Sequence, residues 1–376
     1  MRVAILETVK TSAGFEQEFD RLVFDELKKE HHDPILFLPE NSNLPVDFGV
    51  PIEYLNGGEI IDYEGVGKLK KIFLSIKREY RRVKWFNSAY EKAKKGEIDA
   101  IILTTATYRY LRSLHRSKLK YSPVPVVFIF LGVNPQEKPK FVKEAYKCKN
   151  YPNIKLKVTS LRNDFVEYDL DNLEIINPPV LVPYSISVLN ESVYREPIRI
   201  GFFGHYRKGE KDIEGIIRAF LKANASNKAH LVVQAVPTTE EDKKSLDYIV
   251  NKYKNQKGLE FFRQKLYGKE WYDAIQSIDV MFLPYSNERY LYNWSAVYFN
   301  ALGLFKPSIT TKYLNPEIML NYNVGLEADF SDQTKLTHQL TWFIENYEKN
   351  IVSYNDELAR FNKEYSVKVF LNKLLD

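Results

Sequence analysis

The sequence alternates short apolar runs with helical segments, and this alternation constrains the fold more than any other feature. In the first half, apolar runs occupy 2–8, 34–39, 98–104 and 124–131. A helical segment at 15–29 places its apolar residues on one face: Phe15, Phe19, Leu22, Val23 and Leu27. Continuous apolar runs are typical of parallel strands that helices cover on both sides. We therefore predict an α/β unit in this half.

The alternation restarts after a proline-rich break. Pro178, Pro179 and Pro183 begin a stretch that lasts to Pro197. Beyond it we predict strands at 198–203, 230–235, 259–262, 279–284 and 308–310. Helices are predicted at 213–222, 246–253, 271–278 and 294–304. The 376 residues thus predict two α/β domains that face each other across a cleft: residues 1–180, a linker at 181–197, and residues 198–376, with the last helix packing back on the first domain.

The composition indicates a globular protein with a hydrophobic core, located in a reducing compartment. Hydrophobic residues make up 44% of the chain and charged residues 27%, which is the balance of a globular protein. Cys148 is the single cysteine, so the chain cannot form an internal disulfide. The N-terminal apolar run ends at Glu7, and Pro125 interrupts the stretch 124–133, so both are too short for a signal peptide or a membrane span. We expect a cytoplasmic protein that is soluble or lies on a surface.

The net charge of +5 conceals one strongly basic segment. Residues 68–120 contain 16 Lys or Arg against 4 Asp or Glu, an excess of +12, so the rest of the chain carries −7. Apolar residues at helical spacing predict an amphipathic helix here that ends near Trp85 and Phe86: Leu69, Ile72, Phe73, Ile76, Tyr80 and Val83. Basic residues cover most of the remaining helix surface: Lys70, Lys71, Lys77, Arg78, Arg81, Arg82 and Lys84.

Three partners for this helix remain open. The apolar face docks on the protein core and leaves a solvated basic face, or the helix lies on anionic lipid, where each basic residue adds about 1 kcal/mol. Nucleic acid is the third and weakest, because no zinc-ligand spacing, helix-turn-helix or aromatic RNA-binding motif accompanies the charge. An anionic membrane surface is therefore a candidate partner of 68–120, and we expect no nucleic acid.

Two loops in the second half carry the residues best suited to a ligand. The segment 204–211 follows a strand and precedes a helix, so Arg207 and Lys211 can reach a diphosphate that a helix N-terminus also attracts. The loop 284–295 gathers aromatic residues that suit stacking on a sugar: Tyr290, Tyr292 and Trp294. An ordinary solvated loop is the alternative for 204–211.

The order of these motifs resembles the donor half of glycosyltransferases with the two-Rossmann GT-B fold. The run 272–284 is similar to the family's short helix, Asp, apolar strand and Pro, and 295–309 to its Ser, apolar helix, Lys-Pro and strand. Residues 204–211 resemble the family's diphosphate loop, and 13–16 its small-Gly-x-Glu turn. The likeness covers nearly the whole chain. It implies two Rossmann-like domains and transfer of a sugar, hexosyltransferase-like, from a nucleotide diphosphate sugar.

The resemblance implies roles for individual residues. The donor would contact a set of residues in the second domain: Gly204, Arg207, Lys211, Tyr292, Asn293, Ser295 and Asn300. On the acceptor side it implies Gly14 and Phe15, and Glu16 is the candidate catalytic base if the reaction inverts configuration, with an ordinary first-turn Glu as the alternative. His205, in the ligand loop 204–211, is the second candidate catalytic residue. Positive side chains and a helix N-terminus stabilise the departing diphosphate in this fold, so we expect no metal and no cofactor.

Departures from the family pattern keep other functions open. Many retaining members have Glu, seven residues, Glu, and Tyr292 and Asn300 occupy these positions here. The His that often ends the strand at 124–130 is absent, since Leu131 and Gly132 stand there. The main alternative is a non-catalytic GT-B subunit that binds sugar or protein and supports a partner transferase. A sugar-nucleotide epimerase of the same fold is a third possibility.

The remaining motifs and the acceptor are less constrained. The Asp-Leu-Asp run at 169–171 has the form of a metal-binding motif but lacks its strand context. Isolated histidines are more often structural than catalytic: His31, His32, His230 and His338. We expect the acceptor to be a glycan, a lipid-linked molecule or a protein in surface polysaccharide biosynthesis, reached from the cytoplasm or from the inner face of the membrane.

Overall fold

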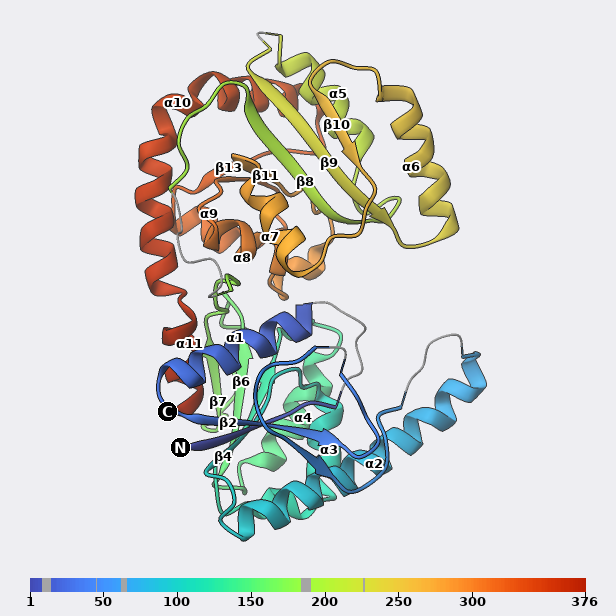
Figure 1. The fold of residues 1–376 in the computed structure, drawn as a ribbon, viewed down its shortest axis with the longest axis vertical. Helices are drawn as coiled ribbons and strands as arrows, with labels where there is room; N and C mark the ends of the chain where they lie inside the picture. Colours follow the sequence, from blue (N-terminus) through green and yellow to red (C-terminus); the bar gives the residue numbers. More distant parts are fainter. Residues whose placement is uncertain (9–14, 45, 62–65, 184–190, 226) are drawn as a thin grey trace. The chain divides into compact units, whose positions relative to one another are not determined.

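The computed structural model of the chain describes residues 1–8, 15–44, 46–61, 66–183, 191–225 and 227–376 (Figure 1). These residues form two compact units. The first unit contains Met1–Pro178 and Val367–Asp376, and the second contains Pro179–Ser366. Each unit is a parallel sheet with helices on both faces, so the predicted α/β class is confirmed.

The sheet of the first unit has the order β3-β2-β1-β4-β5-β6-β7, and every pairing is parallel. Its described strands are β1 (Arg2–Leu6), β2 (Asp33–Pro39), β3 (Ile52–Leu55), β4 (Ala100–Leu103), β5 (Val126–Phe130), β6 (Ile154–Thr159) and β7 (Leu173–Ile176). Its described helices are α1 (Phe15–Lys29), α2 (Lys68–Lys94), α3 (Tyr108–His115), the 3-10 helix η1 (Lys118–Tyr121), α4 (Lys138–Cys148) and α11 (Val367–Leu375).

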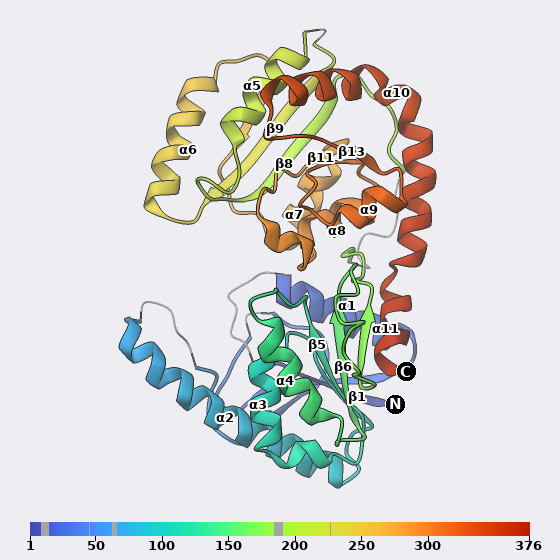
Figure 2. The same ribbon diagram turned by 180° about the vertical axis from the view of Figure 1, so that it is seen from behind.

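Helices of the first unit cover the two faces of its sheet in separate groups. α1 packs with α11 on one face, whereas α2, α3 and α4 lie in a row on the other (Figures 1 and 2). In α1 the predicted apolar face is buried except for Phe15, which is half-buried. The chain leaves β1 in one direction along the sheet and returns to β4 in the other, so β1 and β4 form the topological switch point of this unit.

The basic helix α2 differs from its prediction in length and in orientation. It continues to Lys94, so the predicted end near Trp85 and Phe86 is wrong. Those two aromatic residues are fully buried and mark the place where the helix meets the core. The predicted apolar face between Leu69 and Tyr80 is exposed, so the alternative in which this face docks on the core is wrong. Within the described residues, no helix is both long and apolar enough to cross a membrane.

The second unit repeats the parallel architecture with the order β10-β9-β8-β11-β12-β13. Its described strands are β8 (Ile198–Tyr206), β9 (Ala229–Pro237), β10 (Leu259–Phe262), β11 (Val280–Phe282), β12 (Ser308–Thr310) and β13 (Gly325–Glu327). Its described helices are α5 (Ile213–Ala223), α6 (Glu240–Tyr253), α7 (Gly268–Gln276), the 3-10 helix η2 (Glu288–Leu291), α8 (Ala296–Gly303), α9 (Pro316–Asn321) and α10 (Gln333–Glu364).

The strand β8 is longer than predicted and changes the start of the ligand loop. It pairs with β9 as far as Tyr206 opposite Pro237, so Gly204 and His205 belong to the strand. The polar sequence at 204–206 conceals this, because main-chain pairing with β9 fixes the strand there. Side-chain caps then fix the helices that follow, with Asp212 accepting from the Gly215 amide at the start of α5 at 2.8 Å. The order of strands reverses between β8 and β11, the switch point of this unit.

Candidate functional site

The carboxyl ends of β8 and β11 bring together the two loops that the sequence singled out. Ligands bind at such switch points because strand ends and helix N-termini converge there. Gly204 lies near the end of β8 with a φ of +126°, a conformation that side chains disfavour, and its amide donates to Gln234 Oε1 at 2.9 Å. A Cβ on Gly204 would lie 4.0 Å from Lys211 Nζ. The two predicted donor residues are therefore neighbours in space.

Lys211 holds an amine in a largely dehydrated position. The residue is 9% exposed, and Nζ donates to the His205 carbonyl at 2.6 Å and lies 4.6 Å from the centroid of the Tyr285 ring. The pKa of this amine is lowered to about 8, mainly by burial; the charge of Glu210 opposes the shift, and those of Arg207 and Arg289 contribute to it. An ammonium group has three N–H donors, and within the described residues the structure shows one of them engaged.

Two arginines complete a cationic cluster with Lys211. Arg207 and Arg289 approach the same carboxylate oxygen, Glu210 Oε2, at 3.5 and 3.8 Å. The Arg289 guanidinium stacks on the Tyr290 ring at 4.7 Å, and Tyr290 stacks on Tyr285 with the same centroid separation. The two tyrosine rings thus lie between Arg289 and Lys211. We call Arg207, Lys211 and Arg289 the cationic cluster.

The helix α8 begins beside this cluster. Ser295 caps it, because its Oγ accepts from the Tyr298 amide at 3.4 Å while its own amide donates to Asn315 Oδ1 at 3.2 Å. The Tyr285 hydroxyl also forms a side-chain hydrogen bond with Ser295. The amides at a helix N-terminus carry partial positive charge, so α8 adds to the attraction that the cationic cluster exerts on an anion.

His205 lies on the exposed edge of the same strand end. Partial desolvation lowers the pKa of its imidazole, and the nearby charges of Lys211, Arg207 and Lys265 lower it further. The ring is therefore neutral at pH 7 and cannot add a full charge for binding a diphosphate. A neutral imidazole can accept a proton or donate one hydrogen bond.

Asn293 and Asn300 behave differently in the structure. Both polar ends of the buried Asn300 amide are engaged, since Nδ2 donates to the Leu181 carbonyl at 2.5 Å and Oδ1 accepts from Trp271 Nε1 at 3.1 Å. Asn293 Oδ1 is buried, and among the described residues nothing donates to it. Tyr292 is half-buried in the same loop. Contact of Asn300 with a ribose stays a prediction, whereas the unsatisfied Asn293 oxygen has the capacity to accept a hydrogen bond from a ligand.

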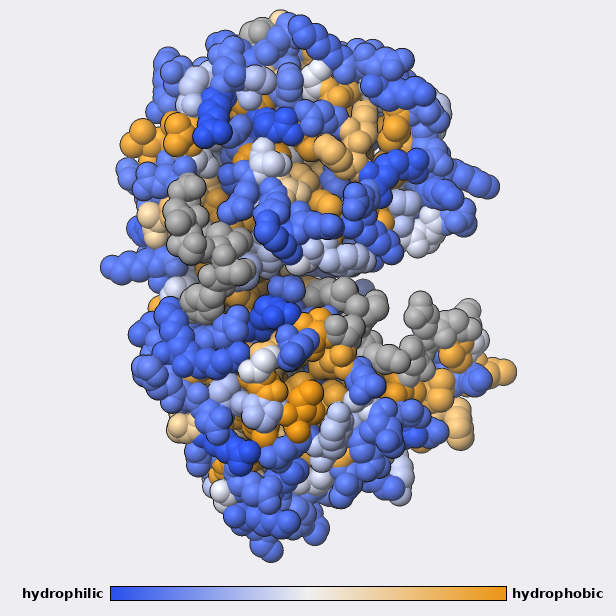
Figure 3. Space-filling view, viewed as in Figure 1, coloured by the Kyte–Doolittle hydropathy of each residue, from blue (hydrophilic) through white to orange (hydrophobic). Residues whose placement is uncertain are grey.

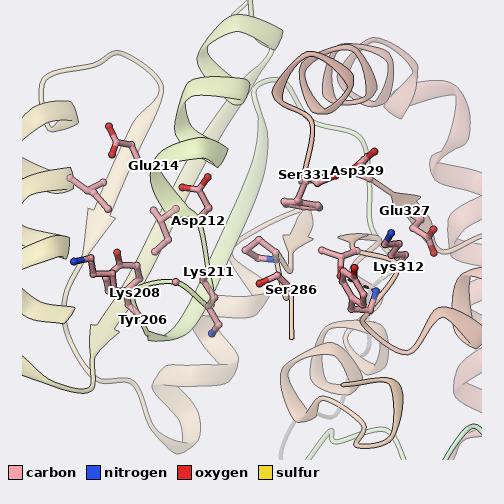
Figure 4. Close-up of a pocket in the computed structure, with 18 of the residues that line it drawn as sticks. Tyr206, Lys208, Lys211, Asp212, Glu214, Ser286, Lys312, Glu327, Asp329 and Ser331 are labelled. Atoms are coloured by element: carbon pink, nitrogen blue, oxygen red, sulfur yellow. Dashed lines mark hydrogen bonds between the residues drawn. The ribbon is translucent and has the colours of Figure 1, made fainter. Parts of the chain in front are cut away.

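A cavity of about 600 Å³ borders the segment after β8, and Lys211 of the cationic cluster is one of the residues that line it (Figure 4). Lys211 and Asp212 are adjacent in the chain and point in opposite directions, with Asp212 toward α5. The cavity lining mixes both signs of charge: Lys208, Lys211, Lys312, Asp212, Glu214, Glu327 and Asp329. Its volume suits a small molecule, but this mixture does not select a diphosphate as the cationic cluster does.

The first unit places its candidates around the end of β1. Gly14 lies outside the described residues. Phe15 and Glu16 open α1 and are half-buried. One turn further, Asp20 is 1% exposed, and burial raises its pKa to about 7 with a smaller contribution from the charge of Glu16. The buried Glu7 at the end of β1 forms a side-chain hydrogen bond with Asp20.

No cation site of three or more His, Cys, Asp or Glu side chains occurs in the part of the chain that the structure describes. Asp169 and Asp171 both pair with Lys149 at 2.9 Å, so a lysine holds the Asp-Leu-Asp run on the surface. That the protein needs neither metal nor cofactor stays a prediction.

Comparison with known proteins identifies the architecture. No family model and no curated protein matches the sequence. Solved structures match over both units. HepE from Anabaena in complex with UDP has a TM-score of 0.64 at 13% identity, over 99% of this chain and 98% of that one. A UDP-forming trehalose-phosphate synthase from Burkholderia xenovorans reaches 0.66 at 9% identity, over all of both chains.

A third match is WaaG, a glycosyltransferase involved in lipopolysaccharide biosynthesis, with a TM-score of 0.60 at 12% identity over 100% of this chain and 98% of that one. The chain has the GT-B fold. The prediction of two Rossmann-like domains is thereby confirmed. Identities of this size establish the GT-B fold and leave substrates to be argued from the site.

Several residues beside the candidate site in the second unit were not predicted from the sequence. Arg289 and Tyr285 stack on either side of Tyr290 beside Lys211, and Lys265 lies near His205. Tyr290 itself was among the loop aromatics that the sequence singled out. Arg289 and Tyr290 lie in the loop 284–295 that the sequence singled out, but nothing in the sequence showed that their side chains stack. In the other GT-B unit, Glu7 and Asp20 were missed because each belongs to a segment expected to be apolar.

Proposed function

We propose that this GT-B protein transfers a sugar from a nucleotide diphosphate sugar to an acceptor, with the donor bound by the second unit. The observation that carries the proposal is the cationic cluster beside the N-terminus of α8 at the β8/β11 switch point. A departing diphosphate develops negative charge, and prearranged cations and helix amides stabilise such charge without a metal. HepE, which shares the fold, was solved with UDP-glucose, and this supports the same ligand class here.

Each donor residue has a proposed task. Lys211 and Arg207 bind the diphosphate, with the Ser295 cap and the first amides of α8 beside it. Arg289 is added to the proposed diphosphate-binding residues, because its guanidinium stacks on Tyr290 within the same cluster. Asn293 accepts a hydrogen bond from the sugar or ribose. His205 contributes a neutral imidazole at the edge of the site.

The acceptor side is proposed to use Glu16 as general base if the reaction inverts configuration, with Phe15 and Gly14 next to it. The buried Asp20 lies one helix turn after Glu16 and forms a side-chain hydrogen bond with Glu7 at the end of β1. We propose a glycan, lipid-linked molecule or protein as acceptor, within surface polysaccharide biosynthesis in the cytoplasm. The protein would act without a metal and would work peripherally on the inner face of a membrane.

Titration calorimetry with a panel of nucleotide sugars tests the donor site first. Arg207→Ala and Arg289→Ala should each lower turnover about 100-fold, the usual effect of removing one group that stabilises transition-state charge. Lys349→Ala is the matched control, because Lys349 is an exposed cation on α10. Unchanged turnover in both arginine variants would remove the cluster from the donor site.

A non-catalytic subunit is the second candidate, and the occupied Asn300 amide together with Tyr292 favours it. The same calorimetry, followed by assays for hydrolysis and for transfer to candidate acceptors, separates the two. Tight nucleotide-sugar binding that depends on Lys211, without turnover under any condition, would support the subunit and contradict the transferase.

A further inference from the structure

The helix α2 carries two apolar surfaces on different sides. Its C-terminal part packs into the core of the first unit through Trp85, Phe86, Ala89 and Ala93. Its N-terminal part exposes five large apolar side chains: Leu69 at 86%, Ile72 at 62%, Phe73 at 68%, Ile76 at 65% and Tyr80 at 62%. We call these five residues the apolar stripe. In Figure 3, hydrophobic side chains gather over this part of α2.

The apolar stripe is not a loosened continuation of the core face. An α-helix turns about 100° per residue, which places the stripe roughly 140° around the axis from the residues that enter the core. Turning the helix to bury the stripe would therefore withdraw Trp85 and Phe86 from the core. Isolated exposed apolar residues are ordinary, but a contiguous row on one helix face marks a surface that binds a partner.

Cations flank the apolar stripe along one side. Lys70, Lys77 and Lys84 are exposed there, and the Lys84 amine lies 4.7 Å from the centroid of the Tyr80 ring. Arg81 continues the row, donates to the Glu59 carbonyl at 2.6 Å and pairs with the Glu59 carboxylate at 3.7 Å. We call Lys70, Lys77, Arg81 and Lys84 the basic row. Between 68 and 84 the sequence has a single acidic residue, which pairs with Arg116.

An open hollow of about 740 Å³ adjoins the basic row. Lys77, Arg81 and Lys84 line it together with Lys118, whereas its acidic members are Glu40 and Glu91. Tyr80 belongs to both the hollow and the apolar stripe. The surface thus joins a hydrophobic ridge to a cationic recess on one helix.

Arg82 does not belong to this surface, although the sequence placed it there. It is 2% exposed, and its guanidinium stacks on the Tyr110 ring at 3.9 Å. Its charge is therefore buried inside the first unit. Variants that test the surface charge of α2 should keep Arg82.

We propose that the N-terminal part of α2 docks on an anionic lipid bilayer, with the apolar stripe entering the interface and the basic row binding lipid phosphates. An apolar row flanked by Lys and Arg is the composition of helices that lie in a membrane interface. Charge complementarity selects this occupant over two others. A second copy would bring two basic rows together, and a nucleic acid would leave the stripe in water.

Vesicle co-sedimentation of the full chain tests the proposal with matched variants. The stripe variant is Leu69→Ser, Ile72→Ser, Phe73→Ser and Ile76→Ser, with Leu320→Ser and Val352→Ser as its control, because both are exposed apolar residues of the second unit. The row variant is Lys70→Gln, Lys77→Gln and Lys84→Gln, with Lys143→Gln, Lys243→Gln and Lys349→Gln as its control. No nucleotide sugar is present, so the result does not depend on the proposed transfer activity.

Wild-type protein and both controls should sediment with phosphatidylcholine–phosphatidylglycerol vesicles and not with phosphatidylcholine alone. The row variant should partition about 100-fold more weakly, since each lysine near an anionic surface contributes roughly five-fold. The stripe variant should lose about 100-fold or more at every salt concentration, because burial of apolar groups is not screened. A Phe73→Trp variant should show lipid-dependent blue-shifted fluorescence that spin-labelled lipids quench.

Three results would overturn the proposal. Wild-type protein could ignore anionic vesicles at low salt. The stripe variant could bind as wild type does while the row variant fails, which would mean electrostatic attraction without insertion. Finally, sedimentation velocity could show a wild-type dimer that the stripe variant loses, with no vesicle binding, which would identify a second copy as the occupant.

Discussion

Replacing Lys211 by methionine should stabilise the protein while it removes activity. The ammonium group is 9% exposed and makes a hydrogen bond of 2.6 Å to the His205 carbonyl. Its pKa falls from 10.5 to about 8, mainly through burial, which corresponds to roughly 3 kcal/mol against the charged form in the folded state. Loss of the hydrogen bond costs about 1 kcal/mol, so Lys211→Met should gain roughly 2 kcal/mol in free energy of unfolding at pH 7.

The pH dependence of this gain follows from linkage. Below pH 8 the lysine is protonated in both states, and the folded state bears the whole penalty. Between pH 8 and 10.5 the folded state loses its proton while the unfolded state keeps it, so wild-type stability rises relative to the variant. The advantage of Lys211→Met should therefore be largest below pH 8 and should have vanished by pH 10.5.

Urea unfolding across this pH range measures the difference, and nucleotide-sugar turnover measures the functional loss. Lys211→Met should lower kcat/KM by about 100- to 1000-fold, the range for losing one group that stabilises developing charge. Lys349→Met replaces an exposed lysine on α10. It should change the free energy of unfolding by no more than roughly 0.5 kcal/mol and should leave kcat/KM unchanged. A variant that is less stable than wild type at pH 7, or a stability difference that does not change with pH, would refute the reasoning.

Three further substitutions probe other parts of the chain. Asp20→Asn should gain roughly 1–3 kcal/mol of stability above pH 7 and nothing near pH 3. The pKa of Asp20 is raised to about 7 in the folded state, so wild-type stability falls as the pH rises to 7. Urea unfolding at both pH values measures this difference. Asn300→Ala should cost about 2–4 kcal/mol in thermal unfolding, since the Leu181 carbonyl and Trp271 Nε1 lose their partner, and an unchanged donor KM would take Asn300 out of the donor site. Gly204→Ala should cost about 1–3 kcal/mol through its φ of +126° alone, because its new Cβ meets nothing closer than 4.0 Å; a melting temperature equal to that of wild type would contradict this.

The sequence predicted the bounds of some elements correctly. The helix α1 at Phe15–Lys29 and the strands at Leu259–Phe262 and Ser308–Thr310 have the predicted bounds. The helix α2 shows the limit of the method, because it has two apolar faces and the sequence cannot say which one the core takes. The structure buries Trp85 and Phe86 in the later part of the helix and leaves the more regular stripe exposed.

The sequence predicted which two loops lie together in the second unit more accurately than it predicted the contacts of their side chains. Residues 204–211 and 284–295 meet at the switch point because parallel strands end on the same edge. Burial of the Lys211 amine, the Arg289 stack and the internal use of Asn300 depend on side-chain packing between loops distant in sequence. A sequence motif shows which residue types lie in a loop, but it does not show which groups their side chains contact.

The helix α11 makes the first unit discontinuous along the chain. Phe370 packs against Phe19 at 5.6 Å between ring centroids, and Lys368 pairs with Glu30 at 2.9 Å. During synthesis, residues 1–178 therefore emerge with one flank of α1 uncovered, and the whole second unit must be made before its cover exists. The flank of α1 that α11 covers is therefore exposed on the nascent chain until residues 367–376 have been made. Nascent chains stalled before residue 367 should bind chaperones more strongly than full-length chains.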